Sequence, residues 1–445
     1  MSFTRTLRAV GGAVVAGALL FGTAPIASAD QIRNEQWPLQ QYDAGSIWKV
    51  STGKGVTVAV LDSPVYGSHP DLSGSVLPGK NFNTGSPADQ GTGAAADHGT
   101  AMASLIAGHG HGAGGADGVK GLAPDAKILP VTIPDGSQGQ VNFAQQLRYA
   151  VDQGAKVVNM SFVTGESTAS PDEQQAIDYA RKHDVLLVAG AGNEGVATPA
   201  IPAAAPGVLA VGAVDNHGEV WKKSNFGPHV KLTAPGVNIR SASPIVDING
   251  KYRLADGTSD STAYVSAAAA LLRSKFPDLT AGQIANRLIK TASLPADQQG
   301  IALPDQHYGY GSINPLSALT KDVPAGSKDG PFPALSGGSS GPSSDPSSAA
   351  GDTGGGVKIA SHKGLSAPFL ILVGVVVLVL LVIVLVVVMV AKKNRRNGPP
   401  PGGPGGFGGP GGPGGYMPNQ QMPYQQQPGA PGSYPQGPPT QPPGQ

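Results

Sequence analysis

Apolar runs alternate with helical stretches between residues 56 and 214, and this alternation constrains the fold more than any other feature. The run from Val56 to Leu61 is apolar except for Thr57, which predicts a strand buried on both faces. Repeated strand–helix alternation predicts an α/β fold, a parallel sheet with helices on both faces. The other predicted strands are Lys127 to Ile133, Lys156 to Met160, Val185 to Ala189 and Val208 to Val214, and the predicted helices are His98 to Ala107, Val141 to Gln153 and Pro171 to Lys182.

Two further helices are predicted in the following part of the chain. The segment from Ala263 to Phe276 is rich in Ala and Leu and predicts a buried helix. Thr280 is expected to cap a helix that ends near Thr291, because Gln283 stands at the capping-box position three residues after it.

Composition limits the classes of function. The net charge of the 445 residues is +1, so nothing suggests a nucleic-acid partner. The chain has no cysteine, which excludes thiolate catalysis and cysteine-based metal sites. Glycine (65) and proline (41) are abundant, and they concentrate after Val323, where a packed core is not expected.

The N-terminus has the form of a secretory signal peptide over residues 1–29. Two arginines precede the uncharged, mostly apolar segment Ala9 to Phe21, and Ala27-Ser28-Ala29 fits a cleavage site, so the mature chain is expected to begin at Asp30. The alternative is an uncleaved anchor, for which the apolar segment is short. Residues 30–54 contain two of the three tryptophans and are expected to pack on the domain that follows, rather than form a disordered leader.

The C-terminal part predicts a membrane anchor. The uncharged run from Phe369 to Ala391 is long enough to cross a bilayer, so we predict one transmembrane helix over 365–391. Four basic residues follow between positions 392 and 396, which places that side in the cytoplasm and the larger domain outside the cell. Residues 321–364 are predicted to be a flexible extracellular linker rich in Pro, Gly and Ser, and 392–445 a disordered cytoplasmic tail.

Three residues far apart in the sequence supply the groups of an activated serine nucleophile. Asp62 ends the first predicted strand, His98 begins a predicted helix, and Ser259 lies at the start of another. An imidazole must take the proton of the hydroxyl, and a carboxylate must hold the imidazole in the correct tautomer. Unrelated folds carry this triad in different chain orders, and the order Asp, His, Ser is that of the subtilisin type.

The segments around these residues resemble the signatures of the subtilisin-like serine peptidases from about Gly55 to Leu319. His98-Gly99-Thr100 with Ile106-Ala107-Gly108 matches the family form at the histidine, and Gly257-Thr258-Ser259 matches that at the serine. The resemblance implies a three-layer fold with a mostly parallel central sheet, a peptidase domain at 55–320, and cleavage of protein or peptide substrates through an acyl-enzyme.

Two other segments resemble parts of the family's substrate site. Asn193 lies in a glycine-rich loop after a predicted strand and by resemblance donates to the oxyanion, although a turn asparagine among glycines is the plain alternative. Asn159-Met160-Ser161 resembles the strand that borders the primary specificity pocket. No cofactor is predicted, and the sequence does not specify calcium sites. The pair His109 and His111 is expected to lie in a surface loop, because no third metal ligand accompanies it.

The sequence departs from the family pattern at three positions near the triad. Pro64 stands where glycine is common, so the loop after Asp62 is expected to be rebuilt. Asp260 follows the nucleophile where an apolar residue is usual, and we expect it to face the helix dipole or solvent. Ala263 replaces a proline.

The overall organisation resembles the mycosins, the membrane-anchored subtilisin-like proteases associated with type VII secretion. The features that carry this are the secretory signal, the aromatic lead-in with Gln36-Trp37, the linker and the single C-terminal helix. The resemblance implies a membrane secretion complex as partner. Two alternatives stay open: a weakly active or inactive scaffold that stabilises such a complex, supported by Pro64 and Asp260, and a general surface protease without a secretion partner.

Overall fold

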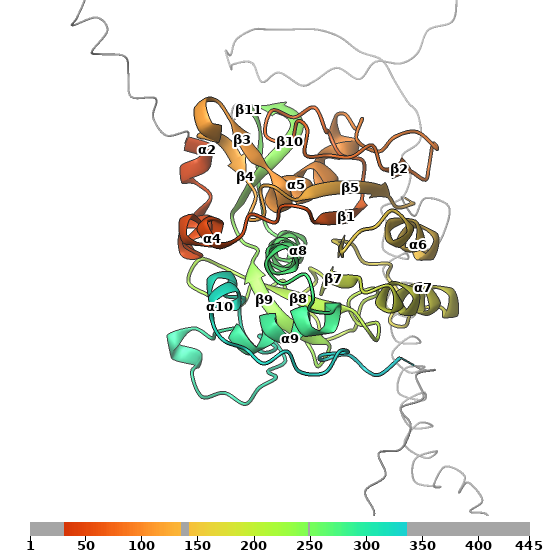
Figure 1. Ribbon diagram of the computed structural model, residues 1–445, viewed down its shortest axis with the longest axis vertical. Helices are drawn as coiled ribbons and strands as arrows, with labels where there is room; N and C mark the ends of the chain where they lie inside the picture. Colours follow the sequence, from red (N-terminus) through yellow and green to blue (C-terminus); the bar gives the residue numbers. More distant parts are fainter. Residues whose placement is uncertain (1–30, 135–141, 248–249, 336–445) are drawn as a thin grey trace, which may run out of the picture. The chain divides into compact units, whose positions relative to one another are not determined.

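A seven-stranded sheet forms the centre of the computed structural model, which describes residues 31–134, 142–247 and 250–335. Its strand order is β2-β5-β1-β6-β7-β8-β9, and all neighbouring strands are parallel, which confirms the predicted α/β class (Figure 1). The strands are β1 (Thr57–Asp62), β2 (Lys80–Asn81), β5 (Lys127–Thr132), β6 (Val157–Met160), β7 (Leu186–Gly190), β8 (Leu209–Val214) and β9 (Val230–Pro235).

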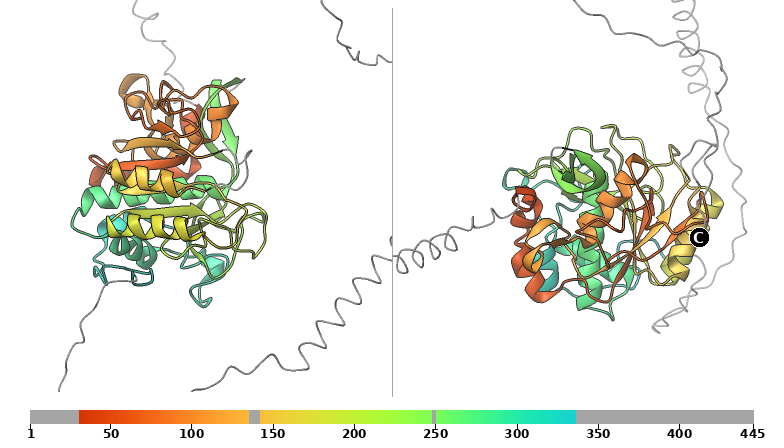
Figure 2. Two further views of the ribbon diagram at one scale, coloured as in Figure 1. Left: turned by 90° about the vertical axis from the view of Figure 1, so that its right-hand side faces the viewer. Right: turned by 90° about the horizontal axis from the view of Figure 1, so that it is seen from above.

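Helices cover both faces of this sheet. The main ones are α5 (Asp97–Ala107) and α8 (Thr258–Lys275) on one face, and α6 (Ala144–Asp152) and α7 (Pro171–Lys182) on the other. Alternate residues of β1 point to opposite layers: Val58 and Val60 pack with the first pair, Ala59 and Leu61 with the second. Figure 2 shows α6 and α7 side by side on their face of the sheet.

The predicted helices are present in the structure. A capping box at Ser170 starts α7, and another at Thr280 starts α9 (Ala281–Thr291), as Gln283 indicated. The buried helix α8 begins at Thr258, so Ser259 lies in its first turn as expected, although the apolar pattern starts only at Ala263. The first turn is polar, and the Thr262 hydroxyl donates to the Thr258 carbonyl within the fold at 2.7 Å.

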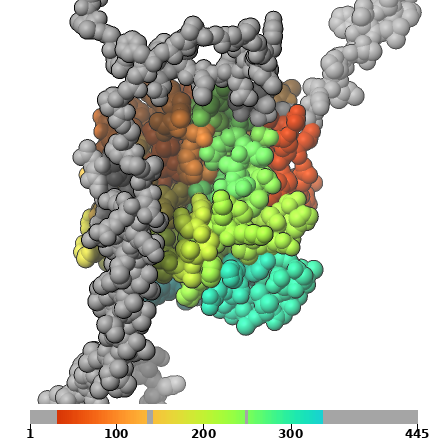
Figure 3. All heavy atoms as spheres, turned by 180° about the vertical axis from the view of Figure 1, so that it is seen from behind, coloured from red at the N-terminus to blue at the C-terminus, as the bar shows by residue number. Residues whose placement is uncertain are grey.

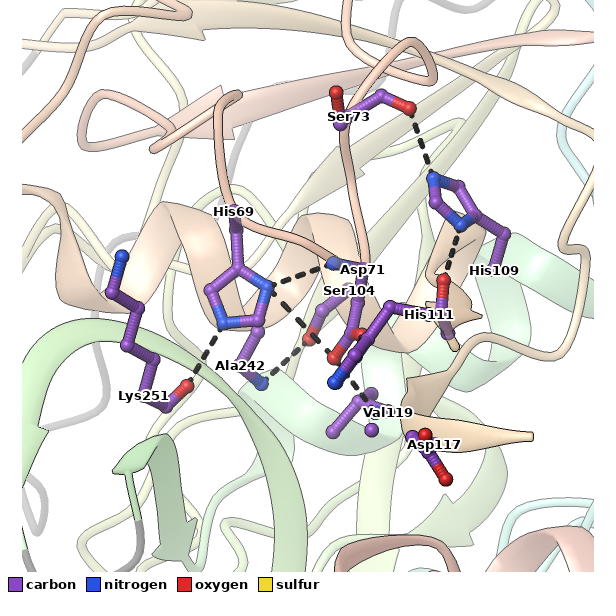
Figure 4. Close-up of polar contacts among 12 residues, drawn as sticks. His69, Asp71, Ser73, Ser104, His109, His111, Asp117, Val119, Ala242 and Lys251 are labelled. Carbon is purple, nitrogen blue, oxygen red and sulfur yellow. Dashed lines mark hydrogen bonds and ion pairs between the residues drawn. The ribbon is translucent and has the colours of Figure 1, made fainter. Parts of the chain in front are cut away.

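Two antiparallel hairpins lie outside the central sheet, and neither was expected. They are β3 (His109–His111) with β4 (Asp117–Lys120), and β10 (Ile239–Asp247) with β11 (Gly250–Ala255). His109 and His111 are therefore in a strand and not in a free surface loop. His111 Nδ1 lies 2.6 Å from the fully buried carboxylate of Asp71, and His109 Nε2 lies 2.9 Å from the Ser73 carbonyl oxygen (Figure 4).

The residues before β1 form three short helices that pack on the domain. These are α2 (Gln31–Asn34), α3 (Trp37–Gln41) and α4 (Ala44–Val50). Ile47 is fully buried in the core, and the indole N–H groups of Trp37 and Trp48 donate to the carbonyls of Val237 and Leu122 at 3.1 and 3.0 Å. Figure 3 shows the N-terminal residues, in red, beside the green segment around residue 240.

The segment 321–335 follows α10 (Pro315–Thr320) and contacts the domain, which differs from the linker expected from 321 onward. The guanidinium of Arg287 donates to the Val323 carbonyl, and Thr280 Oγ1 donates to the Lys328 carbonyl. Arg181 donates to the Pro333 carbonyl at 2.6 Å. Composition alone missed this because backbone carbonyls, and not apolar side chains, make most of these contacts.

Several predicted segments lie outside the described residues. They are the signal peptide at 1–29, the linker beyond residue 335, the transmembrane helix at 365–391 and the tail at 392–445. None of the helices within 31–134, 142–247 and 250–335 is long and apolar enough to cross a membrane.

Replacing Ile47 by Ala tests whether the N-terminal helices belong to the folding unit. The side chain is fully buried against the core, so we expect the free energy of unfolding to fall by about 2–5 kcal/mol. Lys49→Ala, on the exposed side of the same helix, should change it by less than about 0.5 kcal/mol. Urea unfolding at neutral pH measures both, and equal, small effects would show that this helix unfolds separately from the domain.

Candidate active site

The carboxyl end of β1 and the beginning of α5 bring Asp62 and His98 together. Asp62 is the last residue of the strand and is 4% exposed, and His98 is the second residue of the helix. The ring Nδ1 lies 2.8 and 2.9 Å from the two carboxylate oxygens. A proton on Nδ1 donated to Asp62 leaves Nε2 as the nitrogen that can accept a proton.

This pairing depends on a close backbone contact beside it. A Cβ on Gly99 would lie 2.3 Å from the Ser63 carbonyl oxygen and 2.9 Å from that of Pro64, so only glycine lets α5 start here. The Gly99 N–H also donates to Ser63 Oγ at 2.9 Å. The loop that contains Ser63 and Pro64 thus holds α5 against the end of β1.

Ser259 lies in the first turn of α8 and lines the same hollow as His98. Its Oγ donates to the Ser161 carbonyl oxygen at 3.3 Å and makes no hydrogen bond to His98. Ser161 Oγ in turn donates to the Ser259 carbonyl at 3.0 Å, which fastens the end of β6 to the start of α8. For the serine to pass its proton to His98, the hydroxyl must turn from the Ser161 carbonyl to the imidazole.

Asn193 lies beside the start of α8, in the loop that follows β7. Its Oδ1 accepts hydrogen bonds from the backbone N–H of Thr258 at 3.0 Å and from Thr258 Oγ1 at 2.9 Å. This fixes the amide plane and leaves the Nδ2 donors unbonded among the described residues. The side chain lines the hollow together with Ser259, so its amide can donate to a group bound there.

The hollow has a volume of about 230 Å³ and lies where the carboxyl ends of β6 and β7 meet α5 and α8. Two glycines on its wall allow other groups to come close: a Cβ on Gly190 would lie 2.9 Å from Thr258 Oγ1, and one on Gly192 would lie 2.2 Å from Asn225 Nδ2. The lining residues are His98, Ser161, Phe162, Val163, Gly190, Gly192, Asn193, Glu194, Thr258 and Ser259.

Asp260 differs from its expected placement in one respect. It lies in the first turn of α8, where a carboxylate suits the helix dipole, but its side chain is 1% exposed and does not face solvent. Oδ1 has no hydrogen-bond partner among the described residues. Burial raises the pKa of Asp260 to about 6, against the opposing effects of Arg253 and His98.

The pKa of His98 is raised above its ordinary value by its carboxylate neighbours. Burial of the ring acts to lower the pKa, but the charge of Asp62 and its hydrogen bond raise it by more. Asp260 adds to this rise, and Arg253 opposes it. The imidazole therefore sits in a site that favours its protonated form.

The structure also assigns positions to residues that sequence patterns did not single out. Asn225 holds the loop after β7: its Oδ1 accepts from the Glu194 N–H, and its Nδ2 donates to the Glu194 carboxylate at 2.7 Å. Arg253 of β11 forms an ion pair with Asp97, the neighbour of His98, at 2.9 Å. Neither residue belongs to an element that periodicity revealed, since both lie in the part of the chain with no predicted helix or strand.

Comparisons with known proteins identify the family of the chain. The model of the subtilase family, Peptidase S8, matches residues 53–311, more than half of the chain. Fervidolysin from Fervidobacterium pennivorans is 33% identical over 324 residues, which cover 66% of this chain and 45% of that protein. Subtilisin BL from Lederbergia lenta is 36% identical over 245 residues, covering 54% of this chain and 85% of that protein. The chain thus spans less than half of the first relative and most of the second.

Solved structures of similar fold include proteases of type VII secretion systems. MycP1 from Mycobacterium smegmatis has a TM-score of 0.56 and 29% identity, covering 67% of this chain and 87% of that one. The MycP3 protease from the ESX-3 system has a TM-score of 0.53 and 32% identity, covering 64% and 88%. With the match over residues 53–311, these likenesses show that the chain belongs to the subtilase family of serine peptidases.

Proposed function

We propose that this protein is a membrane-anchored extracellular serine endopeptidase of the mycosin type. The observation that carries the proposal is the short contact between His98 and Asp62, together with the position of Ser259, which lines the same hollow as His98. Nothing else in the described part of the chain combines a nucleophile, a base and an orienting carboxylate in this way.

The proposed reaction begins with rotation of Ser259 Oγ from the Ser161 carbonyl to His98 Nε2. As the hydroxyl attacks a substrate carbonyl, its proton passes to Nε2, and Asp62 stabilises the imidazolium through Nδ1–H. The developing oxyanion would lie at the start of α8, within reach of the Ser259 N–H and the free amide hydrogens of Asn193. Proton return to the leaving amine yields an acyl-enzyme, which water then hydrolyses.

The proposals of a membrane anchor and of a secretion partner rest on other observations. The predicted signal peptide and the predicted helix at 365–391 support a single-pass membrane protein with its catalytic domain outside the cell. The likeness to MycP1 and MycP3, which come from the ESX-1 and ESX-3 type VII secretion systems, supports association with such a membrane complex.

A second function is favoured by a specific pair of observations. Ser259 donates to the Ser161 carbonyl, and Asp260 places a buried carboxyl, whose Oδ1 has no hydrogen-bond partner among the described residues, next to the nucleophile, where ionisation would oppose an oxyanion. Both fit a subtilase fold retained as a weakly active scaffold in a membrane complex. The third alternative is a general surface protease without a secretion partner, which would use the same chemistry. Co-purification of components of the membrane complex would distinguish the mycosin-like protease from it.

Ser259→Ala separates a peptidase from a scaffold. We expect it to abolish both fluorophosphonate labelling and peptide hydrolysis, because the attacking oxygen is removed while the fold is kept. Ser261→Ala is the matched control: this hydroxyl lies in the same helix and donates to the Ala234 carbonyl, away from the hollow, so labelling should persist. Failure of the parental protein to label would favour the scaffold, and cleavage by the Ser259→Ala variant at the parental rate would refute the assignment of the nucleophile.

The pH dependence tests His98 as the base. Its imidazole must be neutral to accept the proton, and its pKa is raised, mainly by Asp62 acting against burial. We therefore expect kcat/KM to be low in acid and to rise through a pH above the ordinary pKa of histidine. A profile of peptide hydrolysis in the free-enzyme regime measures this, and a rate that stays the same across about pH 5–9 would exclude His98 from the role.

A further inference from the structure

Asn225 is a buried side chain that bonds with both ends of its amide to the loop after β7. It lies in the connection between β8 and β9 and is 2% exposed. Its Oδ1 accepts from the backbone N–H groups of Glu194 and Val196 at 3.0 and 3.1 Å, and its Nδ2 donates to Glu194 Oε2 at 2.7 Å. These partners fix the orientation of the amide, because a backbone N–H only donates and a carboxylate only accepts.

The hydrogen bonds of Asn225 hold the backbone on both sides of the Asn193 Cα. The peptide group before this Cα has its carbonyl, that of Gly192, bonded to the Asn225 N–H at 3.0 Å. The N–H of the same peptide group donates to Glu194 Oε2 at 2.9 Å, the oxygen that also accepts from Asn225 Nδ2. The peptide group after the Cα donates its N–H, that of Glu194, to Asn225 Oδ1. One buried side chain and one shared carboxylate oxygen therefore set the backbone from which the Asn193 side chain extends.

This contact is closely fitted on the loop side as well. A Cβ on Gly192 would lie 2.2 Å from Asn225 Nδ2 and 2.9 Å from Glu194 Oε2, so no larger residue leaves room for the bond between them. Further along the loop, the Gly195 N–H donates to the Lys223 carbonyl at 2.9 Å. The two segments thus meet through their backbones over several residues, and Asn225 is the buried side chain that joins them next to Asn193.

The amide of Asn193 is held at its other end by the start of α8. Its Oδ1 accepts from the Thr258 N–H and hydroxyl, and the hydroxyl oxygen in turn accepts from the Gly192 N–H at 3.2 Å. Asn193 Nδ2 makes no hydrogen bond among the described residues, and the side chain borders the hollow beside Ser259. The direction of this free donor therefore depends on two supports, Thr258 for the side-chain oxygen and Asn225 for the backbone.

Asn225 does not belong to the wall of the hollow, whereas Asn193 and Glu194 do. A change at Asn225 therefore removes no contact to a bound peptide, and its effect on a reaction passes through the loop. A donor to an oxyanion has to lie within about 2.7–3.1 Å of the position that the oxyanion will take. A displacement of about 1 Å at such a donor can lower the rate by about a hundredfold.

We propose that Asn225 is a positioning residue for the oxyanion donor: by holding the peptide groups on both sides of the Asn193 Cα, it directs the Asn193 Nδ2 hydrogens to the place where the oxyanion forms. This rests on the proposed peptidase function. The donor is needed more by the oxyanion than by the carbonyl of the bound substrate, so loss of its alignment lowers kcat and leaves KM nearly the same.

The first test measures kcat and KM of the full-length parent and Asn225→Asp with a chromogenic peptide on the alkaline plateau. Aspartate has the same size but turns an oxygen without a hydrogen toward Glu194 Oε2, so we expect kcat to fall at least about tenfold and KM to change less than about twofold. Ser224→Ala is the matched control: this buried hydroxyl bonds the Ala213 N–H and the Asn225 carbonyl, not the loop, and kcat should stay within about twofold. A parental kcat for Asn225→Asp would overturn the proposal.

A double-mutant cycle shows whether Asn225 acts through Asn193. Asn193→Ala removes the donor and should lower kcat by about a hundredfold or more. Adding Asn225→Asp to that variant should lower kcat by less than about twofold, because the group that Asn225 positions is already gone. A general loosening of the fold would lower kcat by the same factor in both backgrounds, and equal factors would reject the positioning role.

A second pair of variants serves if Asn225→Asp does not fold. Glu194 is exposed, so its replacement does not disturb the core. Glu194→Gln and Glu194→Leu both remove the charge, but only glutamine keeps an oxygen that can accept from the Asn193 N–H and Asn225 Nδ2. We expect kcat at saturating peptide to be at least about fivefold higher for the Gln variant than for the Leu variant, and equal values would contradict the proposal.

A measurement without turnover separates this inference from the peptidase proposal. In the full-length protein, the side-chain amide of Asn193 can be followed by 15N NMR and identified by the loss of its signals in Asn193→Ala. Asn225→Asp should lower the order parameter of this amide. A lowered order parameter in a protein whose parent hydrolyses no peptide supports the positioning and rejects the peptidase function, whereas an unchanged one overturns the role of Asn225 whatever the activity.

Discussion

The contact between Gly99 and the Ser63 carbonyl is the constraint on which the site depends. A Cβ at position 99 would come within 2.3 Å of that oxygen, so α5 can begin against the end of β1 only because the residue after His98 has no side chain. The same device recurs on the other side of the hollow, where Gly190 lets Thr258 at the start of α8 approach the end of β7. Two helix N-termini thereby meet the carboxyl edge of a parallel sheet, where α/β folds place their sites.

Sequence patterns predicted the parts of the fold that bury regular apolar faces. The strands from β1 to β8 with continuous apolar runs, and the capped helices α7 and α9, follow from local rules. The sequence patterns did not predict the hairpin β10–β11. Its two strands pair only with each other, outside the central sheet, and they carry exposed Ile245, Val246 and Leu254 along with polar residues. Such a strand has no single buried face, and periodicity reports only burial.

The candidate site could be predicted as a set of residues but not as an arrangement of charges. Asp62 and His98 do lie together, and Ser259 lines their hollow, but the direction of the serine hydroxyl toward Ser161 depends on a rotamer. Asp260 lies in the first turn of α8, where its carboxylate suits the helix dipole as expected, but the fold buries its side chain and does not expose it to solvent. Because its folded pKa of about 6 lies above the ordinary 3.8, Asp260 favours folding most in its protonated form at low pH. That advantage is lost as pH rises through about 6, which leaves a cost of about 3 kcal/mol at neutral pH.

The N-terminal helices help to hold the hairpin that carries Arg253. Glu35 forms an ion pair with Arg240 of β10, and the Trp37 indole donates to the Val237 carbonyl at the entrance to the hairpin. β10 is also fastened to α5, since the Ala242 N–H donates to Ser104 Oγ at 3.0 Å. β11 pairs with β10 and carries Arg253, which forms an ion pair with Asp97 beside His98. Through this hairpin the N-terminal extension helps to hold the ion pair of Arg253 with Asp97, the residue before His98. The extension itself does not line the hollow.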